Sequence, residues 1–437
     1  MASNAAASTG CPTPTSSPSS RSQRHVVVVG AGIVGSSAAF FLRRTDPSLR
    51  VTLVDAANSV ASAASGKAGG FLARDWSRDP LMRAGFDLHA ELAREFGAEA
   101  IGYRRMRTVA ASFSMARKEP SPPSSSKSPP TLAPPWLSAD ASRLSEMGDE
   151  STTAQVHPGL LTKRLAEESG AALELGAEVC GLSFVESSSS SSPKGSAAAA
   201  AAVVVGGVSL LDNRELPADA VVLALGPWLG HAARGWELPR GVSLPEVSAQ
   251  RAHSVVLAPR RGEGGGGGGG GAAGKKGEAP PVVCATAVFA AVARRDRVAE
   301  PELYPRGDGT VYVCGESDDA PLPPVAISAV AAVEEERSSS SSSAPSFDPE
   351  RTAMLREMAA AVSPSALGPG NCELVAEQGC YLPLPPPGSG GLPVISRVRG
   401  TENLYVCGGH SCWGILKGPE SGRRVAEMVV EGLRERG

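Results

Sequence analysis

Three closely spaced glycines and one aspartate form the pattern in this sequence that most clearly implies chemistry. Gly30, Gly32 and Gly35 directly follow a run of four valines, and Asp55 lies twenty residues after the last glycine. The first glycine permits a tight turn, the second lets the backbone approach a pyrophosphate, and the third lets a following helix pack closely. Amides at that helix start can bind phosphate oxygens. The spacing therefore predicts a dinucleotide site, in which the aspartate accepts hydrogen bonds from ribose hydroxyls.

The residues after Asp55 bear on the kind of dinucleotide. Ala56 follows the acid, and no Arg or Lys lies beside it. Because a cation there would pair with a 2′-phosphate, the sequence favours a ribose without one. A second loop of small residues begins ten residues after the acid and contains Ser65, Gly66, Lys67, Gly69 and Gly70. By composition alone, this loop could also be an ordinary surface turn.

A third glycine-rich stretch lies near the C-terminus, where residues 404–416 read LYVCGGHSCWGIL. Together with ASGKAGGF at 64–71 and AVVLALGPW at 220–228, it resembles the flavoprotein D-amino-acid oxidase superfamily, which includes glycine oxidase and sarcosine oxidase. The resemblance implies FAD as the cofactor. It also implies that the last helix points its N-terminus at the pyrimidine end of the flavin, where amides stabilise negative charge. The loop and C-terminal motifs are more similar to a branch of largely uncharacterised eukaryotic FAD-dependent oxidoreductases than to any named oxidase.

The glycine pattern and the resemblance together define the expected site. Expected flavin contacts are Gly30, Gly32, Ile33, Val34, Gly35, Asp55, Ala56, Ser65, Gly66, Lys67, Gly69, Gly70, Val179, Gly226, Trp228, Gly409, Gly414, Ile415 and Leu416. His410 occupies the histidine position of the family motif and is the candidate catalytic residue. The alternative is a histidine that caps or packs. No residues stand at metal-ligand spacing.

Two residues upstream of the C-terminal motif bear on the substrate and on flavin attachment. In glycine and D-amino-acid oxidases an arginine binds the substrate carboxylate, and the resemblance puts Leu382 in its place. Leucine cannot make that bidentate contact, so a simple amino-acid carboxylate is in doubt. Cys380 aligns with the cysteine through which sarcosine oxidases attach their flavin covalently. It could equally be a packed apolar cysteine on a buried strand.

The elements that position these residues alternate between strands and helices. The valines before Gly30 predict a strand buried on both faces, residues 36–44 a helix, and residues 51–54 a second strand. Further helices are expected at 81–96, 160–169, 347–362 and 418–432, and strands at 178–185, 202–211, 216–226 and 404–406. The fold class is therefore α/β: a discontinuous Rossmann-type FAD-binding domain with a second, mixed-sheet substrate domain.

Composition limits the partners. The net charge is −3, which gives no basic surface for nucleic acid, and no apolar run reaches the ~18–20 residues that span a bilayer. We expect a small-molecule substrate, free thiols and a cytoplasmic location. The Ser- and Ala-rich N-terminus leaves a plastid or other organelle as the alternative. The oligomeric state is not specified by the sequence.

With 437 residues, the chain is long enough for two domains. We expect a disordered tail at 1–24, an FAD-binding domain from 25–80, 150–235 and 370–437, and a substrate domain from 81–149 and 236–369. Segments at 118–130, 187–202, 262–281 and 318–349 are rich in Gly, Ser, Ala or Pro, and we expect disordered insertions there.

The expected function is oxidation of a C–N bond in an amine or amino-acid-like small molecule, by hydride transfer to flavin N5. Two other classes of function stay open at this point. One is a flavin-fold binding or regulatory protein with little catalysis, and the other is an NAD-dependent dehydrogenase, which would share only the first glycine motif.

Overall fold

The computed structural model describes residues 23–115, 132–185, 202–260, 284–323 and 346–436. The expected insertions at 118–130 and 262–281 lie outside these residues, as do nearly all of the tail 1–24 and of the insertion 187–202. Part of the expected insertion at 318–349 is described, namely residues 318–323 and 346–349. Asp318 is the last residue of a strand, and Asp348 caps a helix.

A six-stranded sheet carries the first glycine motif at its centre. The four valines lie in β1, which is buried along its whole length and pairs in parallel with a strand on each side. The strand order is β19 (Val394–Arg397), β20 (Leu404–Gly408), β12 (Ala220–Leu223), β1 (His25–Val29), β2 (Arg50–Asp55) and β8 (Ala172–Leu175). Only β19 runs antiparallel to its neighbour, so the other five strands end at the same edge.

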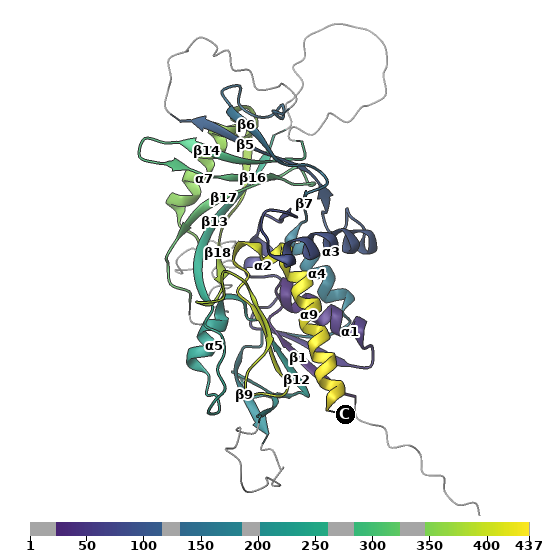
Figure 1. Cartoon of the computed structure of the whole chain (residues 1–437). Helices are drawn as coiled ribbons and strands as arrows, with labels where there is room; N and C mark the ends of the chain where they lie inside the picture. Colours follow the sequence, from purple (N-terminus) through teal and green to yellow (C-terminus); the bar gives the residue numbers. More distant parts are fainter. Residues whose placement is uncertain (1–22, 116–131, 186–201, 261–283, 324–345, 437) are drawn as a thin grey trace, which may run out of the picture.

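Different layers cover the two faces of this sheet. One face packs against α1 (Ile33–Thr45), α3 (Pro80–Phe96), α4 (Pro158–Glu168) and α9 (Gly414–Glu435). The other face packs against α5 (Leu229–Gly235) and the antiparallel sheet of β9 (Val179–Val185), β10 (Val204–Leu210) and β11 (Glu215–Pro217). Helix α9 lies directly on α1 (Figure 1). A Cβ at Gly422 would lie 2.5 Å from Cβ of Ser37, so glycine permits this close approach.

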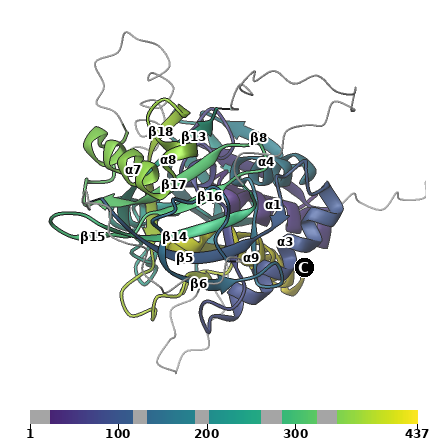
Figure 2. The ribbon, with the colours of Figure 1, turned by 90° about the horizontal axis from the view of Figure 1, so that it is seen from above.

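An eight-stranded mixed sheet forms the other half of the molecule and lies above the first sheet in Figure 1. Its order is β18 (Cys372–Leu384), β13 (Ser248–Pro259), β17 (Val311–Asp318), β16 (Glu302–Pro305), β14 (Thr286–Ala293), β5 (Arg107–Ser114) and β6 (Ser142–Gly148), with β15 (Val298–Ala299) paired to β14. Helices α7 (Pro349–Val362) and α8 (Pro364–Leu367) pack on one face and lie to one side of the sheet in Figure 2.

Successive side chains along these strands point to opposite faces of the sheet. Leu303, Val311 and Val313 point toward α7, while their neighbours Tyr304 and Tyr312 point toward the six-stranded sheet. The face that carries the tyrosines is therefore available to form a wall between the two sheets.

The remaining elements connect the two sheets. They are α2 (Ala64–Lys67) and a small sheet of β3 (Phe71–Ala73), β7 (Thr153–Gln155) and β4 (Arg104–Arg105). The strand β18 falls in the expected FAD segment 370–437 but pairs with β13 in the eight-stranded sheet. The division into domains stays a prediction.

The last helix begins earlier than expected. We predicted a helix at 418–432, but α9 starts at Gly414 and contains Pro419. The carbonyl of Ile415, which would otherwise accept the amide of residue 419, instead contacts His89 Nε2 at 2.9 Å. A side chain on α3 thus replaces the missing donor. Within the described residues, no helix is long and apolar enough to cross a membrane.

Candidate functional site

A cavity of about 690 Å³ lies where the two sheets face each other. It is lined by the carboxyl ends of β1, β2, β12 and β20 and by the inner faces of β13, β16, β17 and β18. In open α/β sheets, ligands bind outside the carboxyl ends of the strands. The position therefore fits a ligand held between the two halves.

The N-terminus of α1 opens onto this cavity. Gly30 has φ +106°, and a Cβ there would lie 2.3 Å from the carbonyl oxygen of Ala224, so the turn requires glycine. Gly32 caps α1 without a side-chain hydrogen bond, and the first turn carries no acid. Gly32, Ile33 and Val34 all line the cavity. A helix start without a side-chain cap and with positive potential suits a pyrophosphate.

Asp55 lies at the end of β2 and fixes two loops. Its Oδ2 accepts the amide of Ala31 at 2.6 Å, and its Oδ1 accepts the amide of Ala57 at 2.8 Å. Burial raises the pKa of the Asp55 carboxyl, and these two backbone hydrogen bonds oppose the shift. The carboxylate still lines the cavity, where a ribose hydroxyl could donate to it.

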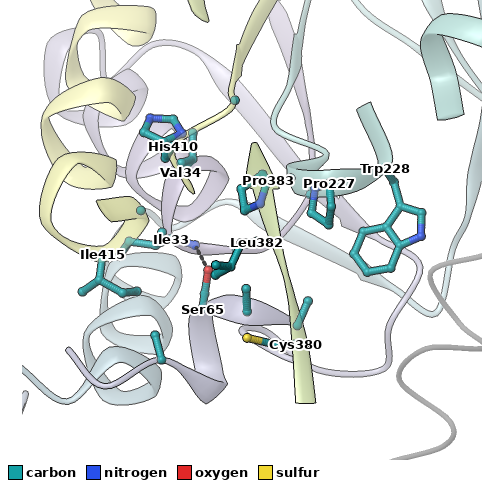
Figure 3. A pocket seen from close by; sticks show the side chains of 18 of the residues that line it. Ile33, Val34, Ser65, Pro227, Trp228, Cys380, Leu382, Pro383, His410 and Ile415 are labelled. Atoms are coloured by element: carbon teal, nitrogen blue, oxygen red, sulfur yellow. Dashed lines mark hydrogen bonds between the residues drawn. The ribbon is translucent and has the colours of Figure 1, made fainter. Parts of the chain in front are cut away.

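The second loop supplies a hydroxyl and a buried lysine. Ser65 Oγ accepts the amide of Ile33 at 2.9 Å, which ties the loop to the start of α1 (Figure 3). Lys67 is buried, and its Nζ donates to the carbonyl of Gly379 at 3.0 Å. The lysine therefore links this loop to β18.

His410 lies at the turn between β20 and α9. It lines the cavity, is 3% exposed, and its Nε2 is 2.9 Å from Ser421 Oγ. Burial, aided by the nearby Lys417 ammonium, lowers the pKa of His410 to about 4. The imidazole is thus neutral near pH 7 and takes part in hydrogen bonding rather than providing charge.

The two residues singled out on β18 both lie in the cavity wall. Figure 3 shows Cys380 and Leu382 on this strand, opposite Ser65 and Ile33. Burial raises the pKa of the Cys380 thiol, and the charge of Lys67 opposes the shift. Leu382 places an apolar side chain at that point of the wall, and its correspondence to the family's arginine stays a prediction.

Most of the expected contacts come together in this one cavity. Those in its wall are Gly30, Gly32, Ile33, Val34, Asp55, Ala56, Ser65, Gly69, Gly70, Val179, Gly226, Trp228, His410, Gly414 and Ile415. Gly35, Gly66, Lys67, Gly409 and Leu416 lie behind it and do not line it. Gly35 instead packs on the backbone of Gly30, and Leu416 is 1% exposed. The roles of all these residues stay proposals.

Apart from Phe71 and Trp413, which lie in the motifs at 64–71 and 404–416, sequence reasoning missed one part of the wall, a set of aromatic residues and a carboxylate. We define the aromatic chamber as Phe71, Trp76, Phe289, Tyr304, Tyr312 and Trp413 together with Glu302. Alternation in ELYP at 302–305 and VYVC at 311–314 was a usable signal for two strands with one polar or aromatic face. It could not show which cavity that face lines.

Comparisons with known proteins define the class. The family described as "DAO: FAD dependent oxidoreductase" matches residues 25–428, so the chain belongs to this family. It is 26% identical to the Schizosaccharomyces pombe protein named "Putative oxidoreductase C1F5.03c" over 423 residues, which cover 94% of each chain.

Solved structures share the fold. Glycine oxidase from Geobacillus kaustophilus matches with a TM-score of 0.62 and 19% identity, covering 93% of this chain and 95% of that one. L-alpha-glycerophosphate oxidase from Mycoplasma pneumoniae, solved with FAD bound, matches with a TM-score of 0.60 and 15% identity, covering 93% and 94%.

The chain is therefore an FAD-dependent oxidoreductase, and the nicotinamide-linked alternative is set aside. The residues present fit the cofactor. The starts of α1 and α9, whose N-cap residues make no side-chain hydrogen bond, and the carboxylate of Asp55 all line one cavity, and a side chain at Gly30 would meet backbone atoms.

Proposed function

We propose that this oxidoreductase oxidises a C–N bond in an amine or amino-acid-like small molecule. The observation that carries the proposal is the continuity of the cavity, which runs from the predicted phosphate turn at Gly32 to the aromatic chamber. A dinucleotide anchored at one end would place its reactive half beside this aromatic part of the cavity. The names of the similar structures, glycine oxidase and iminodiacetate oxidase among them, support a nitrogen-containing substrate.

The chain's own residues have definable tasks in this proposal. FAD, when bound, supplies a ring system that accepts a hydride. Gly414 and Ile415 present the positive end of α9 to the cavity, which stabilises negative charge there. The aromatic residues exclude water and so strengthen electrostatic interactions inside the chamber. His410, neutral and bonded to Ser421, holds the turn from which α9 starts.

Anaerobic mixing of the FAD-loaded protein with a panel of amines and amino acids tests the proposal. We expect at least one compound to bleach the visible flavin absorbance, because oxidation of the substrate must reduce the cofactor. Dithionite serves as the control that the bound flavin can be reduced. If dithionite bleaches the flavin and no nitrogen compound does, the proposal is wrong.

Acid precipitation distinguishes the two interpretations of Cys380. A flavin attached through this thiol stays with the precipitated protein, and the variant Cys380→Ala releases it to the supernatant. A packed apolar cysteine predicts that the colour leaves with the supernatant in both proteins.

A further inference from the structure

The aromatic chamber combines two features that suit one kind of ligand. Of the chain's nine Phe, five Trp and five Tyr residues, six gather in this chamber. The rings of Phe71, Tyr304 and Tyr312 are nearly parallel, with successive centroids 5.1 and 6.1 Å apart. Trp76 lies close to Phe71 and contacts Phe289 edge to face, with centroids 5.2 and 5.0 Å away. Aromatic faces carry negative potential and attract organic cations.

A carboxylate belongs to the same wall. Glu302 lies on β16, two residues before Tyr304 and on the same face of the strand. Tyr304 Oη and Cys314 Sγ both contact Glu302 Oε2, and among the described residues no hydrogen bond involves Oε1. Within the described residues, no Lys or Arg forms an ion pair with Glu302. Burial raises the pKa of this carboxyl, with opposing hydrogen bonds from Tyr304 and Cys314, and a bound cation would offset the cost of its charge.

The described wall of the cavity contains no Lys or Arg. Two nearby cations lie outside the wall. Arg306 packs over the ring of Tyr312 and donates to the carbonyl of Ala68 at 3.1 Å, while its buried Nε makes no hydrogen bond with the described residues. Lys417 pairs with Asp79 at 2.7 Å. The wall also contains Asp55, Glu178 and Glu316; Glu316 is paired with Arg297 and Arg351, and Asp55 accepts two backbone amides. A substrate carboxylate in the chamber would lie near the Glu302 carboxylate with no Lys or Arg in the described wall, whereas a substrate cation would lie near aromatic rings and that carboxylate.

We propose that the aromatic chamber binds the ammonium group of a substrate without a carboxylate, which makes the substrate a simple or N-alkylated amine rather than an amino acid. The inference rests on the proposed function and narrows its substrate class. Its physical basis is the presence of Glu302 beside aromatic rings in a wall whose described residues include no Lys or Arg.

Two inert ions that differ only in a carboxylate test this inference. Tetramethylammonium and trimethylglycine are titrated into the FAD-loaded protein, and binding is measured by calorimetry. We expect tetramethylammonium to bind about tenfold or more tightly than trimethylglycine, because the added carboxylate meets apolar side chains and Glu302. Equal binding, tighter binding of trimethylglycine, or binding of neither ion would overturn the inference.

Substitutions in the aromatic chamber test which residues bind the cation. Glu302→Gln keeps the size of the side chain and should weaken tetramethylammonium binding about tenfold. Glu350→Gln, at the exposed start of α7 on the other face of the sheet, should leave the affinity unchanged. Trp76→Leu removes one aromatic ring from a half-buried position and should weaken tetramethylammonium binding several-fold. It serves as a second test if Glu302→Gln does not fold. Unchanged binding in the folded variants overturns the assignment.

This inference and the proposed function can fail separately. If glycine or another amino acid reduces the flavin and no simple amine does, the inference is wrong and the proposed function stands. If tetramethylammonium binds as expected but no nitrogen compound reduces the flavin, the chamber is a cation site and the proposed function is wrong.

Discussion

At the scale of single residues, His410 shows how position changes the chemistry of a side chain. The sequence marked it as a candidate catalytic residue because of its place in a motif. Its burial, its contact with Ser421 and the nearby Lys417 make it a neutral residue at the turn before α9, and its catalytic role stays a prediction.

The depressed pKa of His410 predicts a pH-dependent stability. The imidazole has a pKa of about 4 in the folded protein and about 6.5 in an unfolded chain. Between these values the unfolded state binds more protons, so this histidine's contribution to stability is complete above pH 6.5 and is lost as pH falls toward 4. The variant His410→Gln, whose amide can still reach Ser421, should lose less stability between pH 7 and pH 5 than the unaltered protein. Urea unfolding at both pH values measures the difference, and identical losses in both proteins would contradict the assignment.

Asp55 is expected to serve both the fold and the cofactor. Replacement by Asn leaves one of the amides of Ala31 and Ala57 facing another N–H donor and removes the charge next to the expected ribose. We expect the Kd for FAD to rise about tenfold and the apoprotein to lose about 1–3 kcal/mol of stability. Flavin fluorescence titration and urea unfolding measure the two effects. Asp46→Asn, at the exposed end of α1, is the matched control, and an equal loss of FAD affinity in it would argue against a specific role of Asp55.

At the scale of elements, α9 depends on a residue from α3. Pro419 cannot donate to the carbonyl of Ile415, and His89 contacts that carbonyl instead. Burial lowers the pKa of His89 to about 4, so the imidazole is neutral near pH 7. The start of the helix that faces the cavity is thus supported from outside the helix.

A double-mutant cycle tests this support. His89→Leu leaves the buried carbonyl of Ile415 without its donor, and we expect a cost of about 1–3 kcal/mol. In a Pro419→Ala background the amide of residue 419 can donate to the same carbonyl, so the cost of His89→Leu should be about 1 kcal/mol smaller. Urea unfolding of the four proteins gives the coupling energy. Additive effects would show that the two residues act independently.

At the scale of the whole molecule, the cavity joins the two sheets. Its wall uses the ends of β1 and β2 on one side and the inner faces of β16 and β17 on the other. A ligand that fills the cavity must therefore stabilise both halves.

Hydrogen exchange with two ligands tests this arrangement. FAD should slow amide exchange in β1 and β2 and also in β13 and β18, because it bridges the two sheets. ADP, which lacks the flavin half, should slow exchange mainly around β1 and β2. Protection by FAD confined to β1 and β2 would show that the eight-stranded sheet does not contact the cofactor.

The sequence by itself determined the class of protein and the elements that carry the first motif. Strand, glycine turn, helix and Asp55 lie within 31 residues, so local backbone preferences and alternation were enough to place them. The strand at Leu404 and the helices near residues 81, 160 and 347 were predicted for the same reason. The aromatic chamber was decided only by the tertiary structure. Phe71, Glu302 and Trp413 are more than a hundred residues apart, and their meeting depends on strand pairing and packing between sheets rather than on any local pattern.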